Sequence, residues 1–225
     1  MNINALLNSG TSGAQGGSTS ASKTATVSAA SPLLAKAGQR IQSALDASST
    51  QLSKFGLLKS ALADGQVTAL ALTQLSSTAS PEAVTTALGT FFKTFNASIS
   101  AATGAANSAA STSASNSAKR VISDAKSALR SDPVVSDAMK KLGLALQSDG
   151  SLVQDAKKFA TSLASDPAGV RAALASVGKK IEALNARELA TSGTVGAALT
   201  GLSQHNTALT TQQKALKAFE QTASA

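Results

Sequence analysis

The sequence predicts a mainly α-helical fold: an elongated helical bundle or coiled coil with one small β-hairpin at about 142–153 and a disordered N-terminal tail. Three observations lead to this fold class. Apolar residues recur at heptad-like spacing in the first and last helical segments. Each of the four prolines follows a residue that caps helices well. One short segment alternates leucines with small residues and then turns at Ser-Asp-Gly.

The chain divides into a tail at residues 1–30 and a helical stem domain at residues 31–225 that carries the hairpin. Residues 8–30 are almost entirely Ser, Thr, Gly and Ala, with a single charge. Such a segment cannot bury enough apolar surface to offset the entropy of ordering it. We therefore expect residues 1–30 to be disordered.

The prolines mark expected helix starts. They occur as Ser31-Pro32, Ser80-Pro81, Asp132-Pro133 and Asp166-Pro167. Proline suits the first helical position, because the N–H that it lacks would be unpaired there. Helices are therefore predicted to begin at residues 32, 81, 133 and 167. Others are expected to begin near residue 117 and after Gly193, with residues 103–117 as a low-complexity linker or a small-residue helix.

Two helical faces are candidates for packing and assembly. The first helix carries an apolar stripe, and the last carries leucines seven residues apart, with Asn206 and Gln213 in the companion seam positions. We predict that these two helices pack antiparallel within one chain. The candidate packing residues, including one from the helix after Pro81, are Leu45, Leu52, Phe55, Leu62, Phe95, Leu202, Leu209 and Leu216.

The composition argues against an enzyme. The 225 residues include no Cys, Trp or Tyr and one His, so disulfide and thiol chemistry are excluded. His205 has no second ligand or nucleophile near it in sequence. The acidic residues show neither metal-loop spacing nor an acid/base pair. We expect no catalytic residues, no cofactor, no metal and no small-molecule substrate.

The formal net charge of +8 raises the question of nucleic acid. Four dibasic pairs, at 119–120, 140–141, 157–158 and 179–180, are interleaved with acidic residues, and the chain has no Tyr or Trp for base stacking. We interpret them as solvated helical faces. No run of about 18 apolar residues predicts a membrane span, and the first residues do not form a secretory signal pattern.

Three blocks of sequence, in order, resemble the flagellar filament-cap protein family, also called hook-associated protein 2. The first contains "LSKFGLLKSAL" at 52–62. The second contains Phe95-Asn96 and then "SAKRVISDAKSALRS" at 117–131. The third is "LGLALQSDGSLVQDAKKFATSLASDPAGVRAALASVGKKIEAL" at 142–184. The resemblance covers about residues 31–222. Family members usually carry large β-rich domains between the first two blocks, whereas here only "TAS" at 78–80 separates them.

The resemblance implies a structural, self-assembling flagellar axial protein that acts through coiled-coil and subunit packing. It implies a homo-oligomer, with flagellin, hook–filament junction proteins and an export chaperone as partners. It also implies an extracellular location in the bacterial flagellum, reached without a cleaved signal peptide. Two alternatives stay open: a helical secreted protein of a related type III secretion system, and a basic nucleic-acid-binding helical protein.

Overall fold

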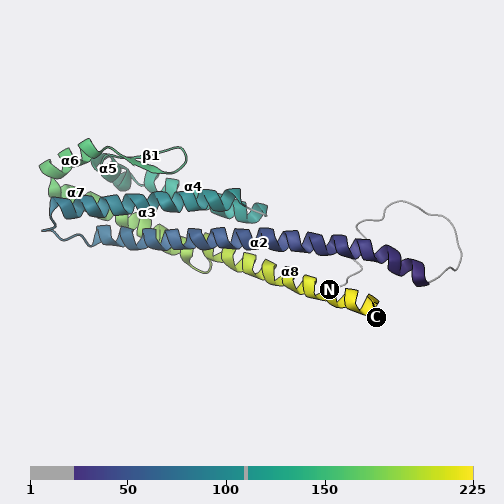
Figure 1. Ribbon diagram of the computed structural model, residues 1–225. Coiled ribbons are helices and arrows are strands. Elements are labelled where there is room, and N and C mark those ends of the chain that lie inside the picture. The colour runs from purple at the N-terminus through teal and green to yellow at the C-terminus, as the bar shows by residue number, and fades with distance from the viewer. Residues whose placement is uncertain (1–22, 109–110, 225) are drawn as a thin grey trace.

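The computed structural model describes residues 23–108 and 111–224. Its elements are α2 (Lys23–Thr73), α3 (Pro81–Asn107), α4 (Thr112–Arg130), α5 (Pro133–Lys141), β1 (Leu144–Leu146), β2 (Leu152–Gln154), α6 (Ala156–Ser165), α7 (Pro167–Leu189) and α8 (Thr194–Ser224). Figure 1 shows an elongated molecule in which α3 to α7 and the hairpin gather around one half of α2. The predicted fold class, a mainly α-helical elongated bundle with a small hairpin, is confirmed.

Three of the four proline-marked helix starts are confirmed. α3, α5 and α7 each begin at the proline, after the capping residues Ser80, Asp132 and Asp166. Each capping side chain accepts a hydrogen bond from a backbone N–H of the first turn, which would otherwise be unpaired.

Two of these capping residues, Asp132 and Asp166, also tie α5 to α7. Asp132, which caps α5, lies 3.3 Å from Lys180 of α7, and Asp166, which caps α7, lies 2.6 Å from Lys141 of α5. The lysine hydrogen bonds and the backbone N–H groups lower the pKa of both carboxyl groups below the ordinary value. Each aspartate therefore fixes a helix start and a helix–helix contact together.

The predicted start at Pro32 is wrong. α2 begins at Lys23, and Pro32 lies inside it. The reason is that proline lacks one N–H and disfavours, but does not forbid, helix on its N-terminal side. The predicted disordered tail falls outside the described residues at 1–22, and the backbone at residues 23–30 is helical. α4 begins earlier than expected, at Thr112, so the predicted linker is largely two helix ends.

α2 is the central helix against which the long helices α3, α7 and α8 pack. Its buried positions form two interleaved series of seven-residue spacing: Ile41, Ser48, Phe55, Leu62 and Ala69, and Gln51, Leu58, Gly65 and Leu72. α3, α7 and α8 all pack against α2. The approach of α7 is close, because a Cβ at Gly178 would lie 2.5 Å from the Ala69 carbonyl oxygen. α2 also continues through Asp64-Gly65 without a break.

Two hydrophobic clusters lie one after the other along the length of the bundle. The first joins the C-terminal part of α2 to α3, the C-terminal part of α4, α5, the hairpin, α6 and α7, and includes Phe91, Phe95, Leu174 and Ile181. The second joins α2 to the end of α3, α4 and the start of α8, and includes Phe55, Leu62, Val121 and Leu202. Large side chains are few, so much of the packing is done by alanines, such as Ala102, Ala105, Ala114 and Ala118.

The hairpin is held by its own turn, by Asn96 of α3, and by Lys126 of α4, which donates to the Ser148 carbonyl at 2.8 Å. Leu144 and Leu152 are buried in the first cluster. Gly150, in the turn, has a φ of 96°, and a Cβ there would lie 2.9 Å from Ile122 of α4. The Asn96 amide donates to the Leu152 carbonyl at 3.0 Å and accepts from the Leu152 N–H at 2.8 Å. Asn96 therefore completes the outer edge of β2 as a third strand would.

Replacing Asn96 by Ala is expected to release the hairpin from α3. Both backbone groups of Leu152 lose their partner, so the free energy of unfolding should fall by about 1–3 kcal/mol. Hydrogen exchange should show the Leu152 amide losing protection first. Ser100→Ala, at an exposed position of the same helix, is the control. Unchanged protection at Leu152 in the Asn96 variant would contradict this account.

Candidate functional site

The outstanding feature of the molecule is a two-helix stalk, made of α2 residues 32–52 and α8 residues 203–222. Figure 1 shows α2 (purple) and α8 (yellow) continuing side by side beyond the other helices. Gln213 donates to Gln42 at 2.7 Å, and a Cβ at Gly38 would lie 3.5 Å from Leu216. Sequence numbers rise on one helix as they fall on the other, so the two helices run antiparallel, as predicted. At 1.5 Å per residue, the stalk is roughly 30 Å long.

The stalk seam is only partly covered. Ile41 and Leu209 are buried, at 8% exposure each, whereas Leu34, Leu45 and Leu216 are half-buried. A pair of helices covers its seam from one direction only, which leaves the edges open to solvent. The apolar surface of the stalk is therefore incompletely removed from water.

The structure places the predicted packing residues in three settings. Phe55, Leu62 and Leu202 lie in the second cluster with Leu52 packed against it, so these four come together at the base of the stalk. Leu45, Leu209 and Leu216 lie further out along the stalk. Phe95 lies in the first cluster instead, with its ring 6.0 Å from that of Phe91.

Two polar side chains are buried at the stalk base, and the packing residues predicted from the sequence include neither of them. Ser48 and Gln51 are 2% and 1% exposed, and neither Ser48 Oγ nor Gln51 Nε2 has a hydrogen-bond partner. Position 51, rather than the neighbouring Leu52, is the deeply buried one. The signal that could have found them is the strict seven-residue series, which passes through 48 and 51 and not through 52.

A second polar group, which we call the polar junction and which contains Ser98, Asn185 and Glu188, lies between the two clusters. Ser98 of α3 donates to the Ala61 carbonyl at 2.9 Å, and Asn185 of α7 donates to the Leu62 carbonyl at 3.2 Å. Both bonds go to the backbone of α2. A cavity of about 10 Å³, the space of roughly one water molecule, is lined here by residues of both clusters and by Glu188.

Glu188 is the most unusual residue of this group, being 1% exposed. Its Oε1 accepts from Arg187 at 3.0 Å, and its Oε2 has no partner. The same guanidinium nitrogen lies 3.2 Å from Asp124 of α4. Burial and the nearby charge of Glu188 raise the pKa of Asp124 above its ordinary value, against the opposing effect of Arg187. One exposed cation, Arg187, thus compensates two acidic groups.

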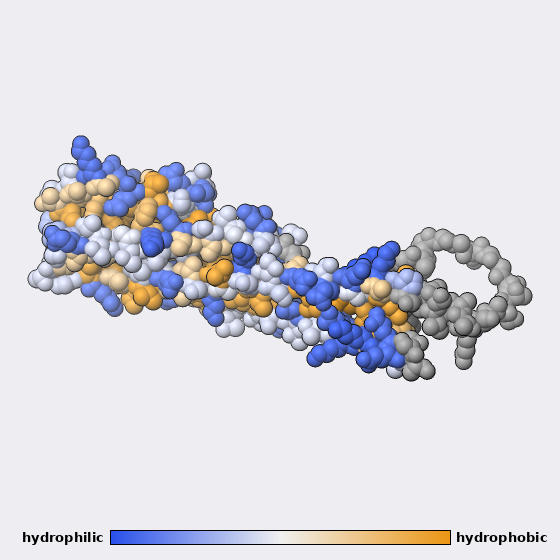
Figure 2. Space-filling view, viewed as in Figure 1, coloured by the Kyte–Doolittle hydropathy of each residue, from blue (hydrophilic) through white to orange (hydrophobic). Residues whose placement is uncertain are grey.

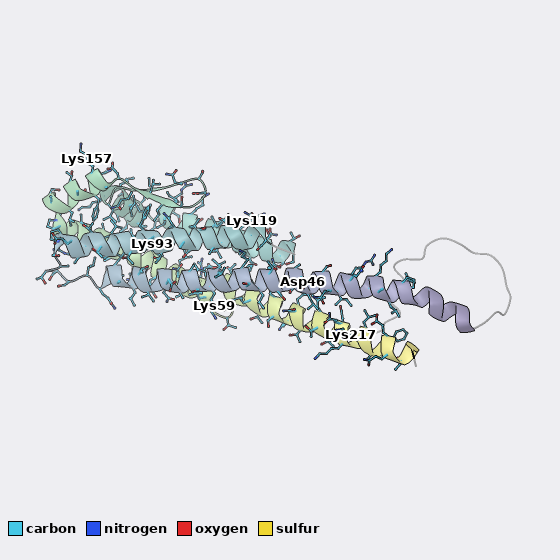
Figure 3. The ribbon with its side chains drawn as sticks, in the orientation of Figure 1. Asp46, Lys59, Lys93, Lys119, Lys157 and Lys217 are labelled. Atoms are coloured by element: carbon cyan, nitrogen blue, oxygen red, sulfur yellow. The ribbon has the colours of Figure 1, made fainter. Side chains whose placement is uncertain are left out.

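The one histidine of the chain, His205, is exposed on α8 and does not belong to the buried polar group that contains Ser98, Asn185 and Glu188. Within residues 23–108 and 111–224, no group of three or more His, Cys, Asp or Glu could hold a metal ion. None of the helices in that part of the chain has the length and hydropathy of a membrane span. The charged side chains labelled in Figure 3 are all exposed and come from five different helices, so they form no single cluster.

Comparison of the chain with family models, with curated proteins and with solved structures finds no significant match.

Replacing Gln51 by Leu is expected to stabilise the protein. The change removes an unpaired buried N–H group and keeps the volume of the side chain, so unfolding should require about 1–3 kcal/mol more. The melting temperature should rise by roughly 2–4 °C per kcal/mol. Gln39→Leu, at an exposed position of the same helix, should not produce this rise. An equal or lower melting temperature for the Gln51 variant would contradict the account of Gln51 Nε2 as a buried group without a hydrogen-bond partner.

Replacing Asp124 by Asn is expected to stabilise the protein most at neutral pH. Because the folded-state pKa of Asp124 is raised, the folded protein keeps a proton that the unfolded chain has lost, and the contribution of this group falls as pH rises through that window. Asn removes the penalty on the charged form. The difference in melting temperature from the unmodified chain should shrink as the pH drops below the ordinary aspartate range. A difference that is constant with pH would contradict the raised pKa.

Proposed function

We propose that this chain is a structural, self-assembling protein of the flagellar axial class, similar to a filament-cap protein without its central β-rich domains. It acts by packing against other subunits and carries out no chemistry. The observation that carries the proposal is the stalk, a long antiparallel helix pair whose apolar seam is covered from one direction only.

Self-assembly follows from the energetics of that seam. Fully burying a leucine stabilises a fold by about 1.5–3 kcal/mol, and half-burial gives only part of this. An isolated pair of helices has little else to hold it, since short helices are marginal in water without tertiary packing. A second stalk laid along the open edge of Leu34, Leu45 and Leu216 would complete their burial. The chain therefore has a thermodynamic reason to associate with copies of itself.

The flagellar assignment is supported by how the three resembling blocks meet. Asn96 of the second block binds the Leu152 backbone of the third. Ser98, just after Asn96, binds the Ala61 carbonyl of the first block, and Asn185, just after the third, binds the Leu62 carbonyl. Segments that resemble one family in sequence thus contact one another through specific polar bonds in the fold. Flagellin, junction proteins and an export chaperone are the partners proposed on this basis, and the extracellular flagellum is the proposed location.

Replacing Leu209 by Asp is expected to open the stalk and abolish association. An aspartate charge at a buried seam position has no partner there. Leu209→Ala, a milder change, should cost about 2 kcal/mol of stability, the lower end of the range for buried leucines, because the site is at the edge of the core. Analytical ultracentrifugation over a concentration series measures the association, and thermal unfolding measures the stability.

Thr211→Asp is the matched control, since it places the same charge on an exposed position of α8. It should associate as the unmodified chain does. A chain that stays monomeric at every concentration would overturn self-assembly. The flagellar assignment has its own test, export of the full chain into the medium by cells with and without the flagellar export apparatus, and equal export from both would overturn it.

A further inference from the structure

The exposed side of α2 carries a third series of seven-residue spacing, which we call the outer face of α2. Its members alternate at spacings of three and four residues, as the core positions of a coiled coil do, and are Ser53, Gly56, Ser60, Ala63, Val67, Leu70 and Gln74. All of them are exposed. A Cβ added at Gly56 would have no neighbouring helix within 4 Å. No other helix of the described chain therefore covers this series.

The outer face has the composition of a helix–helix interface. None of its members is charged. Val67 and Leu70 are 67% and 43% exposed, and Leu57, next to Gly56, is 59% exposed. Its small residues allow a second helix to approach closely. Figure 2 shows hydrophobic side chains on the surface of the wide half of the molecule, the half in which these residues lie.

We propose that the outer face of α2 pairs with the same face of a second copy, in a parallel and in-register coiled coil about a two-fold axis. This inference rests on the proposed self-assembly and names one of the surfaces through which it occurs. In such a pair each member of the outer face lies beside its own counterpart, so that Val67 contacts the partner's Val67.

The charges beside the outer face are complementary in this arrangement. Lys59 and Asp64 flank the face on opposite sides and are both exposed. In a parallel coiled coil, flanking residues five positions apart meet across the interface. Each Lys59 would therefore pair with the partner's Asp64, twice in a symmetric pair. The same spacing sets the exposed Leu57 against the partner's half-buried Leu52.

The antiparallel arrangement is less favourable. If the outer face overlaps itself in reverse, with Ala63 beside the partner's Val67, Asp64 lies opposite its own counterpart. Like charges that oppose one another across an interface are unfavourable. A polyanion is also a poor occupant, because residues 53–74 hold only two cations, Lys54 and Lys59, and one of these lies near an acidic residue.

The outer face extends beyond the stalk. The hydrogen bond between Gln213 and Gln42 sets the register of α8 on α2, which places the start of α8 level with about residue 61. Val67 and Leu70 lie beyond that point. Asp46 is the next charged position of the same series towards the stalk, and it would oppose its own counterpart, so the pairing ends near Ser53. α8 does cover Leu52, at the flank of the outer face, so a change that frees α8 disturbs both surfaces.

The first experiment measures the dissociation constant of the full chain by analytical ultracentrifugation. Val67→Asp places two like charges against each other in an apolar interface, so it should weaken association by more than about tenfold. Val134→Asp is the matched control, because Val134 is 66% exposed on α5 and the change of charge is the same. It should associate as the unmodified chain does. Circular dichroism verifies that both variants stay helical.

The second experiment exchanges the flanking charges. Lys59→Glu and Asp64→Lys each turn both ion pairs into like-charge pairs. Since an exposed ion pair contributes up to roughly fivefold in affinity, each variant alone should associate up to roughly 25-fold more weakly. An equimolar mixture of the two variants should recover the affinity of the unmodified chain, because both pairs are again complementary in the mixed dimer.

The third experiment tests the direction of the helices. The chain contains no Cys, so Ser60→Cys introduces a single thiol. In the parallel pair the two thiols face each other at the roughly 4–7 Å between Cα atoms that a disulfide needs, and oxidation should give a covalent dimer. In the antiparallel pair they would be about 15 Å apart. Ser100→Cys, at an exposed position of α3, is the control and should stay monomeric under denaturing conditions.

The outcomes separate this inference from the proposed function. A chain that associates, with Val67→Asp and the exchanged charges having no effect, would overturn the outer-face interface and leave self-assembly intact. Equal loss in Val134→Asp would overturn it too, as a general effect of charge. Association without a disulfide in Ser60→Cys would overturn the parallel arrangement. A chain that is monomeric at every concentration would overturn both the interface and self-assembly.

Discussion

The seven-residue series along α2 is the constraint on which the rest of the structure depends. It gives one continuous helix a buried face that α3 and α7 cover in the thick half and α8 covers along the stalk. Small residues on this face, and Gly178 opposite it, allow close approach of backbones. The same periodicity runs on past the end of α3 and α7, so α2 has an apolar face where only one helix remains to cover it. The stalk is the consequence.

Much of the fold could be predicted, because it depends on local chemistry. The caps before Pro81, Pro133 and Pro167, and the Asp149-Gly150 turn of the hairpin, act within a few residues and do so in the structure as expected. The start at Pro32 failed, although its dipeptide is the same as at Pro81. A capping residue permits a helix to begin, but the preceding residues can also be helical when their own helix propensity and their tertiary context favour it.

The candidate site could be predicted only in part. The apolar stripe and the terminal leucines identified which helices form the stalk, because apolar residues seven positions apart lie on the face that packs against a partner helix. The buried polar residues were missed because hydrophobic periodicity ignores them. The prediction selected Leu52 as a packing residue, whereas the neighbouring Gln51 is the more deeply buried. The burial of Glu188 depends on how α4 and α7 pack together, which no local sequence pattern indicates. Residues whose role is defined by distant neighbours need the structure.

The buried polar side chains suggest why an open seam stays specific. A seam of alanines and leucines alone could slide by one heptad with little loss, because each layer resembles the next. Ser98 and Asn185 reach the Ala61 and Leu62 carbonyls over Gly65, where a Cβ would lie 3.0 Å from Asn185 Nδ2 and 3.3 Å from Ser98 Oγ. A register slid by one heptad would place Leu58 or Leu72 opposite these two polar side chains. The register of the bundle is therefore set at this polar junction, while the apolar seam beyond it is left partly open to solvent. One segment of α2, at the polar junction, therefore sets the register, and another segment, along the stalk, contributes the burial of apolar side chains.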